Sequence, residues 1–508
     1  MNMNVKSPFD LHCFSSRKIL VAVVLTIVIV LASFCFVTVF NGVSPSAPKV
    51  VYKVVNNEID LRDTIKNAPS KTSIVINVSG DIFLSSTIII PINKDITLTS
   101  DSKNGFYKLI GASGATITVN GSLTIDGIIV THAEDSYGVG VIVDSGGSLI
   151  LSDGKISGNV VTDDYYYSGV YFPVGVGDNG GGVYNDGYFS MTGGEISNNF
   201  VDLYGFGGGV YNSGVFNMSG GVITNNTAYG GYGVYTCGDF AMSGGKISGN
   251  IANVFNGGQM CGSVHNSFGN FNLMNGEISN NTDGVYNSGG AFTMSGGVIS
   301  NNSHYGVYNG GVFNLLGGVI ANNTALRGNT GGGVYNGGGG NFSMTGGIIT
   351  NNTGISYPSI VSGGGVENNG IFNLLGGAIT RNISYNGGGV GSNNIFNMFG
   401  GEISGNTASN RGGGVCIGSG LFQLTGGKIS DNTASYSGGG VWVDAGNLGN
   451  LFVSDGVEFS DNSASTSYNR DSAYDTVYNS NINRNVIWTS PFVQGYNNYD
   501  IGYLEDVY

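Results

Sequence analysis

Charged residues, cysteine and histidine are scarce in this chain of 508 residues. Asp, Glu, Lys and Arg make up 10% of it, against about 25% in a typical soluble domain. The 33 acidic residues outnumber the 19 basic ones, giving a formal net charge of −14 without a basic stripe, which argues against nucleic acid as a partner. Five cysteines and four histidines are scattered without ligand-like spacing, so we expect no disulfide framework, no metal site and no cofactor.

Proline is also rare, with 8 residues, whereas glycine is abundant, with 90. Apolar residues still make up 41% of the chain, and Val, Ile and Phe recur along its whole length. A disordered low-complexity chain would lack these apolar residues. The glycines therefore indicate regular tight turning in a folded, repetitive β protein.

One unit recurs through most of the chain, and residues 207–226 (GGGVYNSGVFNMSGGVITNN) show it clearly. The last Asn of each copy is a convenient marker. The spacing between consecutive markers ranges from 21 residues (Asn281 to Asn302) to 40 residues (Asn159 to Asn199). The excess falls between this Asn and the next glycine run, so the unit is constant and one connection varies.

Within a unit, apolar residues stand two apart, as Phe216 and Met218 do, or singly between polar residues, as Val210 and Ile223 do. This is the period of a β-strand rather than of a helix. Each unit therefore holds three short strands separated by glycine-rich corners. Such strands bury a face only when successive units stack with like residues above one another. The sequence thus predicts an all-β fold, a single-stranded parallel β-helix with one unit per coil.

The marker asparagines are interpreted as structural. An Asn side chain both donates and accepts hydrogen bonds and tolerates left-handed backbone, so equivalent Asn in neighbouring coils can bond to one another. A catalytic role would need one such site rather than many copies. The expected ladder comprises Asn199, Asn226, Asn250, Asn281, Asn302, Asn323, Asn352, Asn382, Asn406 and Asn432.

Residues 19–40 form an uninterrupted apolar run without Gly, Pro or charge. As a helix rising about 1.5 Å per residue, this run would cross a hydrocarbon core of about 30 Å. Arg17 and Lys18 precede it, so residues 1–18 are predicted to be cytoplasmic and the rest extracellular, in a single-pass membrane protein. The alternative is a cleaved signal peptide over residues 1–46, which would make the remainder a secreted protein.

The segments on either side of the repeat lack its regularity. Residues 41–56 are predicted to be a linker. Residues 57–135 are expected to form an N-terminal cap and irregular first coils, with a short capping helix over 57–66. The repetitive β-helix is expected over 136–462, and a C-terminal cap over 463–508.

The GGG-V-Y-N motif followed by F-x-M/L-x-G-G-x-I-x-x-N resembles the right-handed β-helix repeats of adhesin-like surface proteins. It resembles more distantly the repeats of polymorphic outer membrane proteins. The resemblance covers roughly residues 70–462. It implies a right-handed coil and a cell-surface protein for binding or display, with surface glycans or proteins as partners.

The residue after each core Val must point away from the core, and it is aromatic in many copies. Aromatic rings pack against sugars and apolar partners, so an exposed aromatic ladder is a candidate binding surface. The alternative is that stacked rings merely stabilise the sheet. The candidate binding residues are Tyr184, Tyr211, Tyr235, Tyr286, Tyr308, Tyr335 and Trp442.

Asp163 and Asp164, in the longest insertion, are the only catalytic candidates, and weak ones. No His or Arg flanks them, so a solvated acidic loop is the favoured interpretation. We therefore expect a non-catalytic adhesin-like protein. The alternatives are a β-helix polysaccharide lyase or glycoside hydrolase that uses this loop, and a purely structural surface-layer component.

Overall fold

A computed structural model describes most of the chain beyond Lys49. The described residues are 50–100, 105–162, 179–202, 205–253, 261–325, 331–354, 361–454, 456–465, 477–479, 484–486 and 500–502. The chain divides into two compact units, Met1–Lys49 and Val50–Tyr508, and the fold below is that of the second. The predicted segments 1–18 and 19–40 lie outside the described residues. Within the described ranges, no helix has the length and apolar character that a membrane crossing requires.

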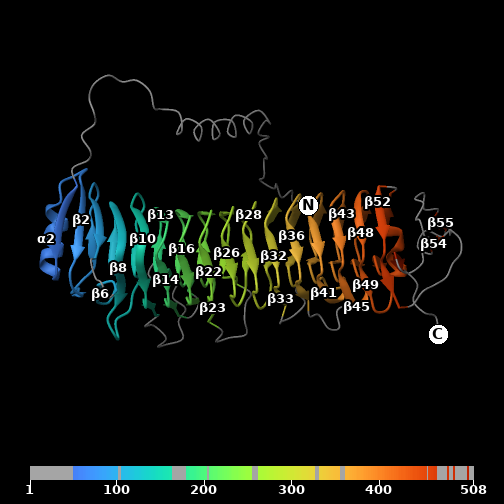
Figure 1. The fold of residues 1–508 in the computed structure, drawn as a ribbon, viewed down its shortest axis with the longest axis horizontal. Coiled ribbons are helices and arrows are strands. Elements are labelled where there is room, and N and C mark those ends of the chain that lie inside the picture. The colour runs from blue at the N-terminus through green and yellow to red at the C-terminus, as the bar shows by residue number, and fades with distance from the viewer. Residues whose placement is uncertain are drawn as a thin grey trace, which may run out of the picture. The chain divides into compact units, whose positions relative to one another are not determined.

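The first elements close one end of a stack of coils (Figure 1). Helix α2 (Glu58–Asn67) is the short helix that the sequence predicts, and the side chain of its N-cap Asn57 accepts a hydrogen bond from the Asp60 backbone N–H at 3.0 Å. Its apolar side chains Leu61 and Ile65 are buried in the common core. Residues 51–55, which the sequence assigned to the linker, instead form strand β1 and pair with β2, so the solenoid begins there.

Most repetitive coils supply strands to three faces, and all pairings between consecutive coils are parallel. What we call the first sheet contains the V-Y-N strands. It has 15 strands in the described part of the chain: β4 Ile88–Ile90, β7 Ile117–Val119, β9 Val141–Val143, β12 Val183–Asn185, β16 Val210–Asn212, β20 Val234–Thr236, β24 Val264–Asn266, β27 Val285–Asn287, β30 Val307–Asn309, β34 Val334–Asn336, β38 Val366–Asn368, β42 Val390–Ser392, β46 Val415–Ile417, β50 Val441–Val443 and β56 Ile501–Gly502.

What we call the second sheet takes two strands from each repetitive coil. Its 29 described strands are β1 Val51–Val55, β2 Ser73–Val78, β3 Ile82–Phe83, β5 Asp95–Thr99, β6 Lys108–Gly111, β8 Ser122–His132, β10 Ser148–Ser157, β13 Tyr188–Met191, β14 Glu195–Ser197, β17 Val215–Met218, β18 Val222–Thr224, β21 Asp239–Met242, β22 Lys246–Ser248, β25 Asn270–Leu273, β26 Glu277–Ser279, β28 Ala291–Met294, β29 Val298–Ser300, β31 Val312–Leu315, β32 Val319–Ala321, β35 Asn341–Met344, β36 Ile348–Thr350, β39 Ile371–Leu374, β40 Ala378–Thr380, β43 Ile395–Met398, β44 Glu402–Ser404, β47 Phe422–Leu424, β48 Gly427–Ser430, β51 Leu451–Val453 and β52 Val457–Ser460.

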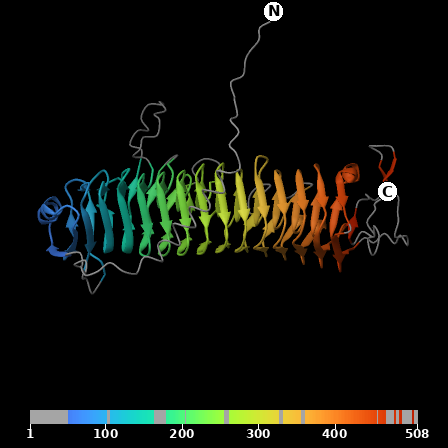
Figure 2. The same cartoon turned by 90° about the horizontal axis from the view of Figure 1, so that it is seen from above.

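The third face is built from very short strands that form two small sheets. These strands are β11 Val160–Val161, β15 Phe200–Val201, β19 Thr227–Ala228, β23 Ile251–Ala252, β33 Thr324–Ala325, β37 Thr353–Gly354, β41 Ile383–Asn386, β45 Thr407–Arg411, β49 Thr433–Ala434 and β53 Ser463–Ala464. Near the C-terminus a 3₁₀ helix spans Ala445–Asn450, and strands β54 (Val477–Asn479) and β55 (Arg484–Val486) pair antiparallel. The predicted all-β parallel solenoid is confirmed, and its coils lie in a regular series in two perpendicular views (Figures 1 and 2).

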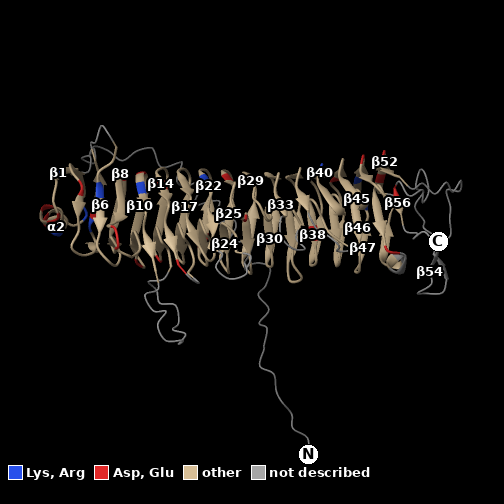
Figure 3. Cartoon of the chain, turned by 90° about the horizontal axis from the view of Figure 1, so that it is seen from below, with Lys and Arg blue, Asp and Glu red and all other residues tan. Residues whose placement is uncertain are grey.

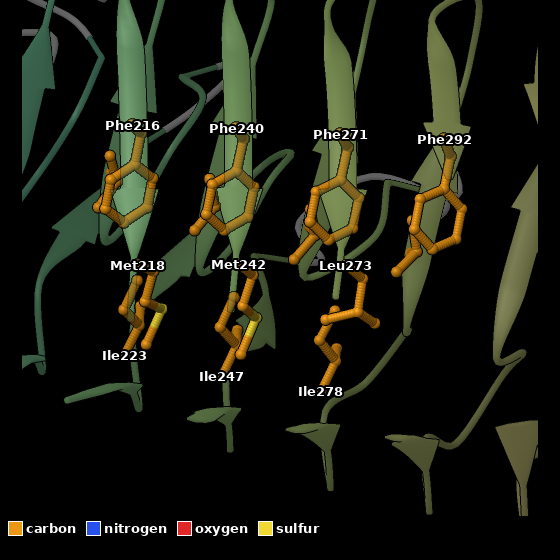
Figure 4. Close-up of a cluster of buried hydrophobic side chains, with 14 of the residues drawn as sticks. Phe216, Met218, Ile223, Phe240, Met242, Ile247, Phe271, Leu273, Ile278 and Phe292 are labelled. Atoms are coloured by element: carbon orange, nitrogen blue, oxygen red, sulfur yellow. The ribbon is translucent and has the colours of Figure 1, made fainter. Parts of the chain in front are cut away.

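The core consists of columns of like side chains, one from each coil. Phe216 stacks on Phe240 with ring centroids 4.7 Å apart and planes 4° apart. Figure 4 shows the same arrangement continuing through Phe271, with Met or Leu and Ile side chains beside the rings. These side chains are fully buried, and burying each one contributes about 1.5–3 kcal/mol.

In each repetitive coil, a residue with left-handed backbone conformation lies at the corner that follows the core Ile. The sequence suggested that the ladder Asn itself takes this conformation, but the structure places it one residue earlier: Asn225 has φ 55°, and Asn301 has φ 56°. Gly249 and Gly405, with φ 67° and 63°, occupy the same position in other coils. This residue turns the chain, so the following Asn is free to point inward.

The inward-pointing asparagines form one continuous hydrogen-bonded ladder. In a typical rung, the Asn250 Oδ1 accepts from both the backbone N–H and the Nδ2 of Asn226, at 3.1 and 3.0 Å. The Asn226 Nδ2 also donates to the Ile196 carbonyl of the preceding coil at 3.0 Å. The ladder contains Asn159, Asn199, Asn226, Asn250, Asn281, Asn302, Asn323, Asn352, Asn382, Asn406, Asn432 and Asn462.

Both ends of this ladder are satisfied by other residues. His132 Nδ1 lies 2.8 Å from the Asn159 Oδ1, and the Asn462 Nδ2 donates to Asp500 Oδ1 at 3.0 Å. Asp500 immediately precedes β56, the last strand of the first sheet. The predicted C-terminal cap thus contributes the final rung and the final strand.

A second ladder uses the Asn of the V-Y-N strands, which the sequence analysis did not single out. Asn287 Nδ2 donates to Asn309 Oδ1, and Asn309 Nδ2 to Asn336 Oδ1, both at 2.8 Å. Thr236 interrupts the series, and the buried Asn266 Oδ1 is left without a hydrogen-bond partner among the described residues. Repetition of this Asn at the end of the core strand was the available signal.

Replacing Asn323 by Ala should destabilise the solenoid. The Asn323 Oδ1 accepts from the Asn302 backbone N–H and Nδ2 at 3.0 and 2.9 Å, and all of these groups are buried. Leaving them unpaired should lower the free energy of unfolding by about 2–4 kcal/mol. Urea denaturation followed by circular dichroism measures the change, and hydrogen exchange should localise the loss of protection to neighbouring coils. Asn314→Ala, on the outer face of β31, is the control and should change stability by less than about 0.5 kcal/mol; equal effects would contradict a structural role for the ladder.

Candidate ligand-binding site

The outer face of the first sheet carries a column of aromatic rings. In β27 and β30 the Val and Asn point inward, while Tyr286 and Tyr308 between them point outward and are half-buried. Their ring centroids lie 4.6 Å apart, and those of Tyr308 and Tyr335 lie 4.9 Å apart. His265 takes the same position in β24 and packs edge-on against Tyr286 at 4.8 Å. The predicted column is therefore present as a stack from Tyr184 to Tyr335, whereas Glu367, Gly391 and Cys416 separate it from Trp442.

The column is less accessible than the sequence suggested. Tyr184 and Trp442 are buried, and Tyr211 and Tyr235 are half-buried. The Arg411 guanidinium lies over the Trp442 ring, 4.7 Å from its centroid. Because stacked rings cover one another's faces, their edges and hydroxyl groups remain for a ligand. Face-on packing of sugars along the whole column is therefore excluded.

The glycine run before the core Val is replaced in four consecutive coils by larger residues. The run reads Gly-Gly-Gly at 207–209 and at 331–333. The four replacements are Gly231-Tyr232-Gly233, Cys261-Gly262-Ser263, Thr282-Asp283-Gly284 and His304-Tyr305-Gly306. The last two lie within the two shortest marker spacings, Asn281 to Asn302 and Asn302 to Asn323, each of 21 residues. Side chains with chemical function thus collect where other coils carry only backbone.

Asp283 is the centre of this group. Its Oδ1 accepts a hydrogen bond from His304 Nδ1, and its Oδ2 accepts one from the Tyr232 hydroxyl, both at 2.8 Å. The Asp283 side chain is 4% exposed, whereas that of His304 is 20% exposed. The carboxylate thereby fixes the imidazole with its other nitrogen, Nε2, away from Asp283. His304 is the member of the group that a ligand can reach.

Two tyrosines, one cysteine and one histidine of these four coils are held in their neutral forms. Burial raises the pKa of Tyr232 and Tyr305 well above the usual value for tyrosine. Burial, assisted by Asp283, raises the pKa of Cys261 to about 11, so this residue is a thiol rather than a nucleophilic thiolate. Burial also lowers the pKa of His265 to about 4, so its imidazole is neutral.

Several buried polar atoms in these coils have no hydrogen-bond partner among the described residues. They include the Tyr305 hydroxyl, the Ser263 hydroxyl and the His265 Nδ1. The Tyr305 ring lies 5.9 Å from that of Tyr308, so the group is contiguous with the aromatic column. Unpaired buried polar atoms are costly and tend to mark sites of water or ligand binding.

The sequence alone did not reveal the Asp283–His304 pair, because the two residues are 21 residues apart in the chain. Each is the second residue after a ladder asparagine, Asn281 and Asn302 respectively. Residues at the same offset from the marker lie one above the other in adjacent coils. Comparing copies by register rather than by sequence distance would have paired them.

The other predicted site residues take no part in this group. Asp163 and Asp164 lie outside the described residues, so their prediction stays untested. Within the described coils, no three His, Cys, Asp or Glu residues are grouped so that they could hold a metal ion. Comparison with protein-family models, curated proteins and solved structures finds no match to this chain.

Glu367 in β38 takes the position that Tyr occupies in neighbouring coils. The residue is 2% exposed, and burial raises the pKa of its carboxyl group to about 8. Hydrogen bonds from Asn369 and the Gly363 backbone offset only part of this rise. Glu367 is therefore a buried carboxyl group that is protonated at neutral pH.

Glu367 should make the stability of the solenoid depend on pH. The pKa is higher in the folded chain than in the unfolded chain, where it is about 4.5, so the folded state binds the proton more tightly. This contribution to stability is complete below pH 4.5 and is lost as the pH rises to about 8. At about 1.4 kcal/mol per pKa unit, the loss amounts to a few kcal/mol.

Urea denaturation of the wild type and of Glu367→Gln at pH 5 and pH 8 measures this dependence. We expect the substitution to have little effect at pH 5 and to stabilise the chain relative to the wild type at pH 8. Glu402→Gln, at an exposed position of β44, is the control and should show no such pH-dependent difference. A constant difference between wild type and Glu367→Gln across this range would contradict the assignment.

Proposed function

We propose that this chain is a membrane-anchored, adhesin-like extracellular rod that binds a polyhydroxylated ligand such as a glycan on the first sheet. The observation that carries the proposal is the group in the two shortest coils. There Asp283 holds His304, and the ring of Tyr305, the next residue, lies 5.9 Å from the stacked, half-exposed pair Tyr308 and Tyr286. The hydroxyls of these two tyrosines make no hydrogen bond to a described residue. They are therefore available to a ligand.

The chemistry of this group suits a sugar. Phenol hydroxyls and an imidazole both donate and accept hydrogen bonds, as sugar hydroxyls do. Burial raises the pKa of Tyr286 to about 12, so its hydroxyl stays protonated and able to donate. Parallel stacking repeats the Tyr position in each coil, which suits a polymer with repeating hydroxyls better than a single small molecule.

The membrane anchor and the handedness belong to the proposal and rest on the sequence. Residues 19–40 have the length and apolar character of a span, with residues 1–18 on the cytoplasmic side. The resemblance to adhesin-like repeats supports a right-handed coil, cell-surface display and partners among surface glycans or proteins. Cleavage of residues 1–46 would release the same rod as a secreted protein.

Replacing Tyr286 and Tyr308 by Phe tests the binding site. The substitution removes two hydroxyl groups but keeps the stacked rings, so the fold should persist. We expect the double variant to bind about tenfold more weakly than the wild type, because each lost hydrogen bond contributes about 0.5–1.5 kcal/mol. The measurement is binding of the purified full chain in detergent to immobilised xylan, mannan, chitin and polygalacturonate, with His304→Ala as a second variant.

Tyr188→Phe, exposed on the second sheet, is the matched control and should bind like the wild type. Unchanged binding in the double variant would favour the purely structural alternative, and binding to none of the four polymers would contradict a glycan ligand. Mass spectrometry of the same incubations tests the enzymatic alternative. Shortened or unsaturated oligosaccharides that disappear on Asp163→Ala, Asp164→Ala or His304→Ala would show a lyase or hydrolase.

A further inference from the structure

The outer face of the second sheet carries a column of residues whose character changes along the stack. It consists of the residue just before the core Ile of each coil, which we call the leading column. In chain order it reads Lys155, Glu195, Val222, Lys246, Glu277, Val298, Val319, Ile348, Ala378, Glu402, Lys428 and Glu458. Apart from Val222, charged residues lie towards both ends and apolar residues in the middle. Figure 3 shows Lys and Arg in blue and Asp and Glu in red along the coils.

The charges of this column are paired within the chain. The Lys246 ammonium lies 3.0 Å from Glu277, and the Lys428 ammonium lies 3.5 Å from Glu458. All four side chains are more than a third exposed. Each pair therefore presents one positive and one negative group to an approaching surface.

The middle of the column belongs to a wider apolar strip. Ile348 is 43% exposed, and the neighbouring Leu316 and Leu375 are 50% and 48% exposed. Val312 and Ile371, at the start of β31 and β39, are also exposed on the same face. In the central coil, the exposed polar residues Asn341 and Thr345 lie between these apolar positions. Exposed apolar residues gathered on one face in this way mark an interaction surface.

The two coils next to that of Ile348 carry similar apolar residues at equal positions. The coils on either side carry Leu316 with Val319, and Leu375 with Ala378. Val312 and Ile371 are likewise one coil before and one coil after this centre. A two-fold axis along the strand direction through Ile348 therefore places Leu316 opposite Leu375 and Val312 opposite Ile371, whereas two coils from the centre it places Val298 opposite Glu402.

The same axis places opposite charges against each other. Three coils from the centre, Glu277 meets Lys428 of a second copy. Four coils from the centre, Lys246 meets Glu458. A parallel arrangement of two rods with coils level would instead set Glu277 near Glu277 and Lys246 near Lys246. Charge complementarity thus selects the antiparallel arrangement.

We propose that the occupant of this strip is a second copy of the chain, packed antiparallel on the second sheet with the two-fold axis at Ile348. The interface is isologous, as closed dimers require. It lies on a different sheet from the His304 group and does not depend on that site. In such a pair, the first coils of the two copies lie at opposite ends. If the chains are anchored in membranes, as proposed above, the pair would join two surfaces.

Exchanging charges within one intramolecular pair tests this arrangement. Lys246→Glu with Glu277→Lys keeps the ion pair within the chain but sets Glu against Glu458 and Lys against Lys428 of the second copy. The variant Lys428→Glu with Glu458→Lys does the same from the other end. Each variant alone should dimerise at least about tenfold more weakly than the wild type, because all four opposed pairs become repulsive.

Mixing the two variants should restore the dimer, because every opposed pair is again of opposite sign in the mixed pair. Sedimentation velocity of the full chain in a nonionic detergent measures all of these states. Lys155→Glu with Glu195→Lys is the matched control, since its ion pair at 3.0 Å lies beyond the coils that meet. This control should dimerise like the wild type.

Ile348→Cys provides an independent measurement. The two-fold axis brings this position against itself, so oxidation should yield a cross-linked dimer, whereas Val222→Cys should not cross-link. Three results would each overturn the proposal: the wild-type chain stays monomeric, either charge-exchange variant alone dimerises like the wild type, or the mixture of the two variants stays monomeric. A glycan found on Asn341, which begins an N-x-S sequon in the central coil, would also overturn it, because it would stand in the interface.

Discussion

Register between coils is the constraint on which the rest of this structure depends. Strands of three or four residues bury almost nothing alone, so each coil is stable only when its Val, Phe and Ile lie against the same residues of its neighbours. The asparagine ladder enforces that register. In each rung the side-chain oxygen accepts from two donors of the preceding Asn, and the amide donates to the following Asn and to the Ile carbonyl of the preceding coil. A slip of one residue would therefore break several buried hydrogen bonds at once.

This constraint leaves the outer residues and one connection per coil free to vary. Inward positions are nearly invariant from copy to copy, whereas outward positions carry Tyr, His, Glu, Cys or Trp on the first sheet and Lys, Glu, Val or Ile on the second. The outward residues can therefore change, and with them the function, without disturbing the packing of the core. The Asp283–His304 pair shows how: replacement of a glycine run in adjacent coils is enough to bring a carboxylate and an imidazole together.

Much of the fold could be predicted because the same residue pattern recurs in each copy of the repeat. The apolar period of two, the recurring Asn and the single variable connection indicate a parallel β-helix without any reference to long-range contacts. The candidate site could be predicted only in part. The aromatic column was visible, but its accessibility was not: Trp442 lies beneath Arg411, and the tyrosine rings cover one another. Whether an outward side chain meets solvent or a neighbour depends on the adjacent coils, which no single copy describes.

The sequence by itself determined the coil, its core columns and the first asparagine ladder, because these follow from period and repetition within the chain. Tertiary structure alone decided which residues of different copies touch. The spacing between copies varies from 21 to 40 residues, so the distance along the chain does not reveal that Asp283 meets His304, that Glu367 is buried, or that apolar residues of the second sheet gather around Ile348. Those contacts arise only when the coils stack, because stacking places residues at equivalent positions of consecutive repeats next to each other, whatever the length of the connection between them.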